Sequence, residues 1–172
     1  MSEPLLHFVI PFSAFTMSGI PPRRAAFASI FAVLPDLDVL VHVHRSVTHS
    51  ALVLAVVIVP VILLTWRTKY RAYALLAGAG LASHLVMDLF SLGYTPILWP
   101  IYEEGVRFHV YLATHIDGSL GFHAEILTRP ATFEFRGIEA PALTGEGLIV
   151  AILLLAPALL TELARSQQQS HQ

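Results

Sequence analysis

Residues 51–66 have the sequence ALVLAVVIVPVILLTW, which contains no charged side chain, and RTKYR follows directly at residues 67–71. An apolar run that is closed by Arg67, Lys69 and Arg71 is typical of a helix that crosses the hydrocarbon core of a bilayer and ends at its surface. This stretch therefore predicts a membrane protein. The segments before and after it are interpreted as parts of a membrane protein too.

The composition of the whole chain agrees with this interpretation. Of its 172 residues, 55% are hydrophobic and only 13% are charged, and the mean hydropathy is +0.68; a soluble domain has roughly 25% charged residues. The net charge of −2 excludes a basic nucleic-acid-binding protein. The chain has no Cys, which excludes disulfides and thiolate metal ligands, so a metal site would have to use the nine His and the acidic residues.

The remaining apolar stretches set the predicted architecture. We predict an all-α, multi-pass transmembrane helical bundle of about five apolar helices, which forms one integral-membrane domain over residues 1–165. Residues 103–141 are more polar and are predicted to form an outward segment, and residues 166–172 a disordered tail. The five apolar stretches are 5–20, 25–35, 51–66, 72–92 and 143–163.

Basic residues close the first, third and fifth stretches, at residues 23–24, at residues 67–71 and at Arg165. With five spans these clusters fall on one side of the membrane, which the positive-inside rule makes cytoplasmic. The N-terminus, the connection at residues 35–50 and the polar segment 103–141 are then expected to face outward.

Ionisable side chains inside the apolar stretches fall at one depth. A helix rises 1.5 Å per residue, so Asp36 lies ~18 Å from Arg24, and His84 lies ~18 Å from Ala72. Asp88 follows His84 at i+4 and shares its helical face. Charges at such a depth are costly unless they pair, bind an ion or meet water. We predict that six residues near the outer face form one metal site: His7, Asp36, Asp38, His49, His84 and Asp88.

His and carboxylate ligands without Cys suit a divalent metal, with zinc favoured and manganese or iron as alternatives. Each motif also has a simpler interpretation, because His84 and Asp88 could pair within a helix, and Asp36 and Asp38 could end one. These interpretations must account for six ionisable residues at one depth, which favours the shared site. The His of the polar segment are interpreted as solvated side chains rather than ligands: His109, His115 and His123.

Four short motifs follow His7 along the chain: PDLD at residues 35–38, HRSVTHS at 44–50, SHLVMD at 83–88 and PILWP at 96–100. In this combination and order they resemble the motifs of the YdjM-like family of membrane-bound metal-dependent hydrolases of bacteria and archaea. That family also has a His near its start.

The resemblance covers roughly residues 5–102 and implies a hydrolase, because the family is distantly similar to zinc-dependent phospholipase C, an all-helical enzyme with a His/Asp metal cluster. A metal with an open position activates water for hydrolysis. Membrane lipids are the expected partners, and lipid or other membrane-proximal phosphoesters the expected substrates. Arg45 would hold a phosphate oxygen, and His44 would be a further ligand or a general acid. Glu125 could match an acidic residue late in the family pattern.

Two other functions stay open at this point. One is a protein that binds or transports metal without catalysis, and the other is a structural protein whose buried ion holds helices together. A closed coordination shell would favour the structural role, and an open position would favour the enzyme. Thr48 and Ser50 are expected to orient ligands rather than to bind the metal.

Overall fold

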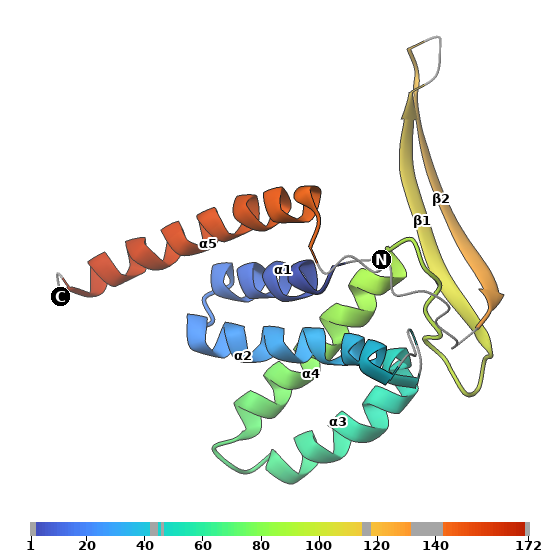
Figure 1. The fold of residues 1–172 in the computed structure, drawn as a ribbon. Helices are drawn as coiled ribbons and strands as arrows, with labels where there is room; N and C mark the ends of the chain where they lie inside the picture. The colour runs from blue at the N-terminus through green and yellow to red at the C-terminus, as the bar shows by residue number, and fades with distance from the viewer. Residues whose placement is uncertain (1–2, 42–44, 46, 115–117, 132–142, 171–172) are drawn as a thin grey trace.

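The computed structural model describes residues 3–41, 45, 47–114, 118–131 and 143–170. It is a bundle of helices with one β-hairpin at its end (Figure 1). The elements in chain order are α1 (Pro4–Met17), α2 (Pro22–Val33), the 3-10 helices η1 (Leu34–Val41) and η2 (Val47–His49), α3 (Ala51–Thr65), α4 (Arg71–Leu89), β1 (Glu104–Thr114), β2 (Leu120–Pro130) and α5 (Gly145–Ser170).

The chain reverses between α1 and α2 because the residues there favour a turn. Gly19 has a φ of +91°, a conformation that glycine adopts without steric cost. Pro21 and Pro22 follow, and Pro22 is the first residue of α2, where a missing N–H costs no intrahelical hydrogen bond. The turn lays α2 back along α1.

The main contacts between helices are those of α5 with α1, α1 with α2, α2 with α4, and α4 with α3 (Figure 1). The contact between α2 and α4 is built from small residues. Ala25, Ala28 and Ala32 of α2 are fully buried, and a Cβ on Gly80 of α4 would overlap the Ala28 carbonyl oxygen. Small side chains let helix backbones approach closely, as in membrane helix pairs.

Helices α3 and α5 leave large apolar surfaces uncovered. No residue of α3 is buried, and Val56 and Leu64 on it are 75% and 82% exposed. Contiguous apolar surface of this kind is rare on soluble monomers. Two helices, over Arg71–Leu89 and Gly145–Arg165, are long and apolar enough to cross a membrane. The prediction of about five apolar spans is thus not confirmed: α4 and α5 are candidate spans by length and composition, α1 and α3 are apolar but shorter, and α2 has 12 residues.

Basic side chains gather at one end of the bundle. The Arg165 guanidinium, on α5, donates to the Thr16 carbonyl of α1 at 2.9 Å. The Arg24 guanidinium, at the start of α2, lies 5.7 Å from the ring centroid of Tyr73. Tyr73 and Arg71 are both in the first turn of α4. Basic residues from segments far apart in the sequence therefore share one end of the structure.

Helices α1 and α5 run parallel. At the end opposite Arg165, the Thr144 hydroxyl, just before α5, donates to the buried carboxylate of Glu3, just before α1. A carboxylate beside the first turn of α5 is favourable, because the N-terminus of a helix carries partial positive charge. The two helices therefore begin together, and α5, which has 26 residues against 14 in α1, continues beyond the end of α1 (Figure 1).

The hairpin corrects the all-α prediction. Residues 104–114 and 120–130 form two antiparallel strands, in a register that runs from Glu104 opposite Pro130 to Thr114 opposite Leu120. Their sequences alternate apolar and polar side chains, which is the period of a half-covered strand and not that of a helix. The prediction was wrong here because it weighed the charge of this segment and not its alternation.

The C-terminal helix also differs from expectation. Helix α5 continues to Ser170, through most of the Gln-rich segment at residues 166–172 that was predicted to be a disordered tail. Gln is a good helix former, so a helix that has already been nucleated by an apolar segment extends through it at little cost.

Candidate metal centre

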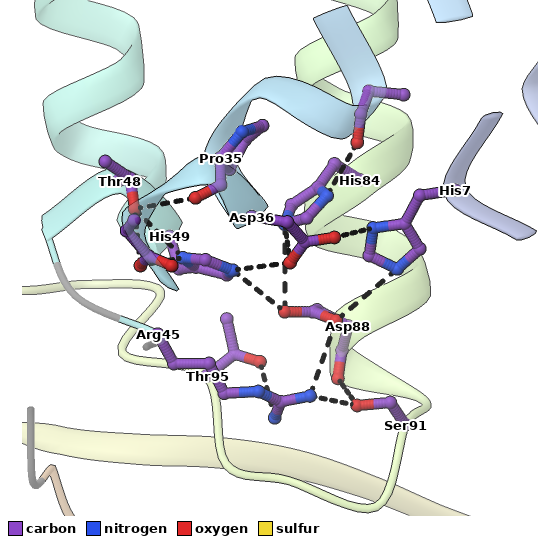
Figure 2. Close-up of polar contacts among 12 residues, drawn as sticks. His7, Pro35, Asp36, Arg45, Thr48, His49, His84, Asp88, Ser91 and Thr95 are labelled. Carbon is purple, nitrogen blue, oxygen red and sulfur yellow. Dashed lines mark hydrogen bonds and ion pairs between the residues drawn. The ribbon is translucent and has the colours of Figure 1, made fainter. Parts of the chain in front are cut away.

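Four segments of the chain bring His and Asp side chains to one point (Figure 2). His7 comes from α1, Asp36 from η1, His49 from η2, and both His84 and Asp88 from α4. The PDLD motif contributes by tightening the end of α2 into a 3-10 helix at Pro35, which has no N–H for the α-helical hydrogen bond. The chain thus continues helically past Pro35 and carries Asp36 toward α4.

The carboxylates of Asp36 and Asp88 lie between imidazole rings. His7 approaches Asp36 with Nδ1 at 3.0 Å from Oδ2, and Asp88 with Nε2 at 3.6 Å from Oδ1. The Nε2 of His49 is 3.3 Å from Asp88 Oδ2 and 3.6 Å from Asp36 Oδ1. Figure 2 shows these side chains pointing toward one another. All of them are buried.

His84 has the clearest ligand geometry. Its Nδ1 lies 2.7 Å from the Ala32 carbonyl oxygen, which can only accept, so Nδ1 carries the proton and Nε2 presents a lone pair. This Nε2 is buried and has no hydrogen-bond partner within the described part of the chain; it lies 3.9 Å from Asp36 Oδ1 and 3.8 Å from Asp88 Oδ2. A backbone carbonyl that fixes the tautomer of a His is typical of metal-binding sites.

Two overlapping groups of three side chains have donor atoms within 4.8 Å of one another. One group is His7, His84 and Asp88, and the other is Asp36, His49 and His84. Both include His84, so they are two halves of one cluster. Among the residues that the structure describes, these are the groups of His, Asp and Glu that could hold a metal ion.

Asp38 lies behind His49 rather than within either group. Its Oδ2 is 3.3 Å from His49 Nδ1, on the opposite side of the ring from Nε2, and it accepts a 3.0 Å hydrogen bond from the Thr48 hydroxyl. Asp38 stays a predicted ligand, and its contact with His49 Nδ1 is of the kind by which a carboxylate orients a ligand histidine.

Charge and burial favour a bound cation. The cluster holds three carboxylates, of Asp36, Asp38 and Asp88, against one guanidinium, of Arg45, and all four residues are buried. With the imidazoles neutral, as metal ligands have to be, this leaves a formal excess of two negative charges, which is costly away from water unless protons or a bound cation compensate it. A divalent cation matches that excess.

Asp36 and His49 lie outside the two candidate membrane spans and titrate together. Burial raises the pKa of the Asp36 carboxyl, but hydrogen bonds with His49 and His7 outweigh this and hold it well below its usual range. Burial lowers the pKa of His49, whereas hydrogen bonds with Asp36 and Asp38 raise it to about 9. A cation that binds at His49 therefore has to displace a proton.

Arg45 borders the cluster on the side of Asp88. One of its Nη atoms is 3.4 Å from Asp88 Oδ1 and also donates to the Ser91 hydroxyl, and the other is 3.5 Å from the Thr95 hydroxyl. Its φ of +54° is uncommon for a residue with a side chain. A Cβ on Gly93 would overlap the guanidinium, so a larger residue there would require the Arg45 side chain to shift. The carboxylate that Arg45 pairs with in the structure is that of Asp88.

The PILWP motif holds the start of α3. The Ile97 carbonyl accepts from the Ala51 N–H at 2.9 Å, and the Trp99 carbonyl accepts from the Ser50 hydroxyl. Ser50 also caps α3, because its hydroxyl accepts from the Val53 N–H. Ser50 thus fixes the chain directly after His49 and contacts no ligand side chain in these bonds.

Sequence reasoning missed several contributors to the site. Ser91, Gly93 and Thr95 surround Arg45, and the Ala32 carbonyl orients His84. Glycine and hydroxyl residues are common in the turn after a helix, so their presence does not indicate a functional site. The sequence also does not show which backbone carbonyl will accept a hydrogen bond from a histidine. Their roles follow from proximity in the fold.

The remaining candidate residues lie elsewhere. His109 and Glu125 are opposite each other on the hairpin, and His123 stacks on Tyr111 at a centroid distance of 4.8 Å. These positions agree with the interpretation of His109 and His123 as side chains outside the metal site. Two predicted residues lie outside the described part of the chain: His44 and His115.

The fold and the site together define a helical membrane protein with a buried His/Asp cluster that could hold a metal ion. The family model described as YdjM inner membrane protein matches residues 5–166, and the chain belongs to this family. The predicted family resemblance is thus confirmed, over more of the chain than the motifs cover. No curated protein and no solved structure matches the chain.

Proposed function

We propose that the protein is a membrane-bound metal-dependent hydrolase that cleaves phosphoester bonds of lipids or other membrane-proximal molecules. The observation that carries this proposal is the convergence of the predicted ligands around one point with a guanidinium beside them.

The residues present fit a divalent cation. His84 offers an Nε2 whose proton is held elsewhere, and Asp36, Asp88, His7 and His49 surround the same point. We assign these five residues as ligands, with zinc as the favoured metal. Such an ion supplies Lewis acidity and lowers the pKa of water.

Arg45 would then hold the anionic part of the substrate. Its guanidinium carries five donors in a fixed plane, which suits a phosphate group. The Nη atoms contact Asp88, Ser91 and Thr95, and Nε has no hydrogen-bond partner among the described residues. A phosphate oxygen near Asp88 would find this donor still available.

An apolar groove supports a lipid as the substrate. It lies between α2, α3 and α4, has a volume of about 480 Å³, and extends from Pro35 and Thr48 to Thr65 and Tyr73. Thr48 contacts Asp38, so one end of the groove opens beside the cluster. From Leu54 to Thr65, α3 rises ~17 Å, close to the ~15 Å thickness of one hydrocarbon leaflet. A single acyl chain fits that length.

Two neighbouring residues of α3 test the groove. Val57 lines it, whereas Val56 is exposed and is not among its lining residues. We expect Val57→Trp to raise KM for a long-chain phospholipid about tenfold, ~1.4 kcal/mol, because the indole fills the acyl path. Steady-state hydrolysis by metal-loaded protein in mixed micelles measures this effect.

The control is Val56→Trp, which is expected to keep the wild-type KM. A short-chain, water-soluble phosphodiester should be cleaved equally by both variants and the wild type. Equal effects of the two substitutions on KM would mean that the groove does not bind the acyl chain. If fully metal-loaded wild-type protein hydrolyses no phosphoester across a broad lipid panel, the phosphoesterase proposal gives way to a structural or metal-binding role.

The topology of the proposed enzyme is a separate prediction. Because Arg24, Arg71 and Arg165 share one end of the bundle, the positive-inside rule makes that end cytoplasmic. Reporter fusions after Arg71 and after Arg165 should give cytoplasmic signals, and a fusion at Gly118 an external one. A cytoplasmic signal at Gly118 would place the metal site on the inner face instead.

A further inference from the structure

The β-hairpin has two chemically different faces. Because successive side chains of a strand alternate between faces, Tyr111 and His123 lie opposite each other on one face together with His109. That face, called the polar face below, also carries Arg107, Glu125 and Arg129. The other face, called the apolar face, is formed by Phe108, Val110, Leu112, Leu120, Phe122, Ala124 and Ile126.

The apolar face is largely uncovered within the described structure. Leu112 and Leu120 are 65% and 67% exposed, and Phe122 and Ile126 are both 70% exposed. An isolated two-stranded hairpin is marginally stable in water and needs packing on its hydrophobic face. Strands of 11 residues each therefore require something to cover this face.

The base of the hairpin indicates what that cover is. The ring of Phe108, on the apolar face, packs edge-to-face on Phe90 at a centroid distance of 5.4 Å. Phe90 directly follows Leu89, the last residue of the candidate span in α4. The apolar face thus starts at the level where a membrane helix ends. Leu92 and Ile101, in the connection between α4 and β1, are also largely exposed.

The hairpin then runs across the end of the bundle rather than along its helices (Figure 1). An element that lies across the ends of membrane-spanning helices lies along the bilayer surface. Amphipathic elements in that position bury their apolar side chains ~5–10 Å into the boundary between headgroups and acyl chains. The polar face, with its Arg, His and Glu side chains, would remain in water.

We propose that the apolar face of the hairpin rests in the lipid surface, at the end of the bundle that holds the His/Asp cluster. The lipid supplies the packing that a two-stranded hairpin lacks. The His/Asp cluster then lies next to the bilayer surface on which the hairpin rests. This inference does not depend on catalysis or on a bound metal.

The absence of native Cys makes the test direct. Single-Cys variants Phe122→Cys and Ile126→Cys on the apolar face, and His123→Cys and Glu125→Cys on the polar face, each take one nitroxide label. In proteoliposomes of phosphatidylcholine and phosphatidylglycerol, we expect labels at 122 and 126 to collide with dissolved O₂ and to be shielded from a water-soluble nickel chelate. Labels at 123 and 125 should show the reverse pattern.

Two outcomes would overturn the proposal. Equal access of the nickel chelate to labels on both faces would mean that the hairpin stands free in water. Shielding of positions 122 and 126 from both reagents, with oxidative cross-linking of Ile126→Cys into dimers, would mean that a second copy covers the face. The apolar positions are mostly exposed, so the labels should leave the fold intact, which thermal unfolding of each variant checks.

Discussion

Replacing His84 with Asn should strip the protein of its metal while leaving it folded. An Asn amide can still donate to the Ala32 carbonyl, as Nδ1 of His84 does at 2.7 Å, but it has no counterpart of the Nε2 lone pair. Loss of a residue that merely orients a ligand costs 10–100-fold in affinity, so loss of the ligand itself should lower metal content at least ~10-fold. Elemental analysis of the detergent-purified protein measures this effect.

The matched control is His123→Asn, because His123 lies on the hairpin and stacks on Tyr111. It should keep the wild-type metal content. Binding of metal to the folded state also raises stability, so a chelator should lower the melting temperature of the wild type and of His123→Asn but not that of His84→Asn. Undiminished metal in a folded His84→Asn variant would refute the cluster as the metal site.

Arg45→Lys is expected to separate catalysis from metal binding. Lys keeps the positive charge beside Asp88, which lies 3.4 Å from the guanidinium, but it loses the planar arrangement of donors. If Arg45 holds phosphate in the transition state, kcat/KM for a phosphodiester should fall about 100-fold, ~2.7 kcal/mol. Metal content, measured in parallel, should stay at the wild-type level.

Arg67→Lys is the matched control for this substitution, since Arg67 is exposed at the end of α3 remote from the cluster. It should change neither metal content nor activity. If Arg45→Lys loses metal as well as activity, Arg45 is a structural partner of the carboxylates, whose position depends on its planar set of donors. If it keeps both, Arg45 has no part in the reaction.

The sequence determined the environment and most of the site. The apolar run at residues 51–66 predicted a membrane protein by composition alone, and helix rise placed Asp36 and His84 at one depth. The i, i+4 spacing put His84 and Asp88 on one face. These inferences hold because they depend on periodicity and on the cost of charge in lipid, both of which are local properties of the chain.

Two features of the fold have a signal in the sequence that the prediction did not use. The alternation along residues 104–130 has the period of a strand, yet the charge of the segment led to a polar outward region in an all-α bundle. The helical η1 after Pro35 was also unexpected, because Pro ends an α-helix but is compatible with the tighter 3-10 turn that follows.

Only the tertiary structure decided which group faces which. It placed Asp38 behind His49, paired Arg45 with Asp88, and set the Ala32 carbonyl against His84. Each of these contacts joins residues whose relative position depends on helix packing, and that packing is set by small residues such as Gly80 against Ala28. The sequence specifies such packing through the shapes of many side chains at once, so no single motif reveals it.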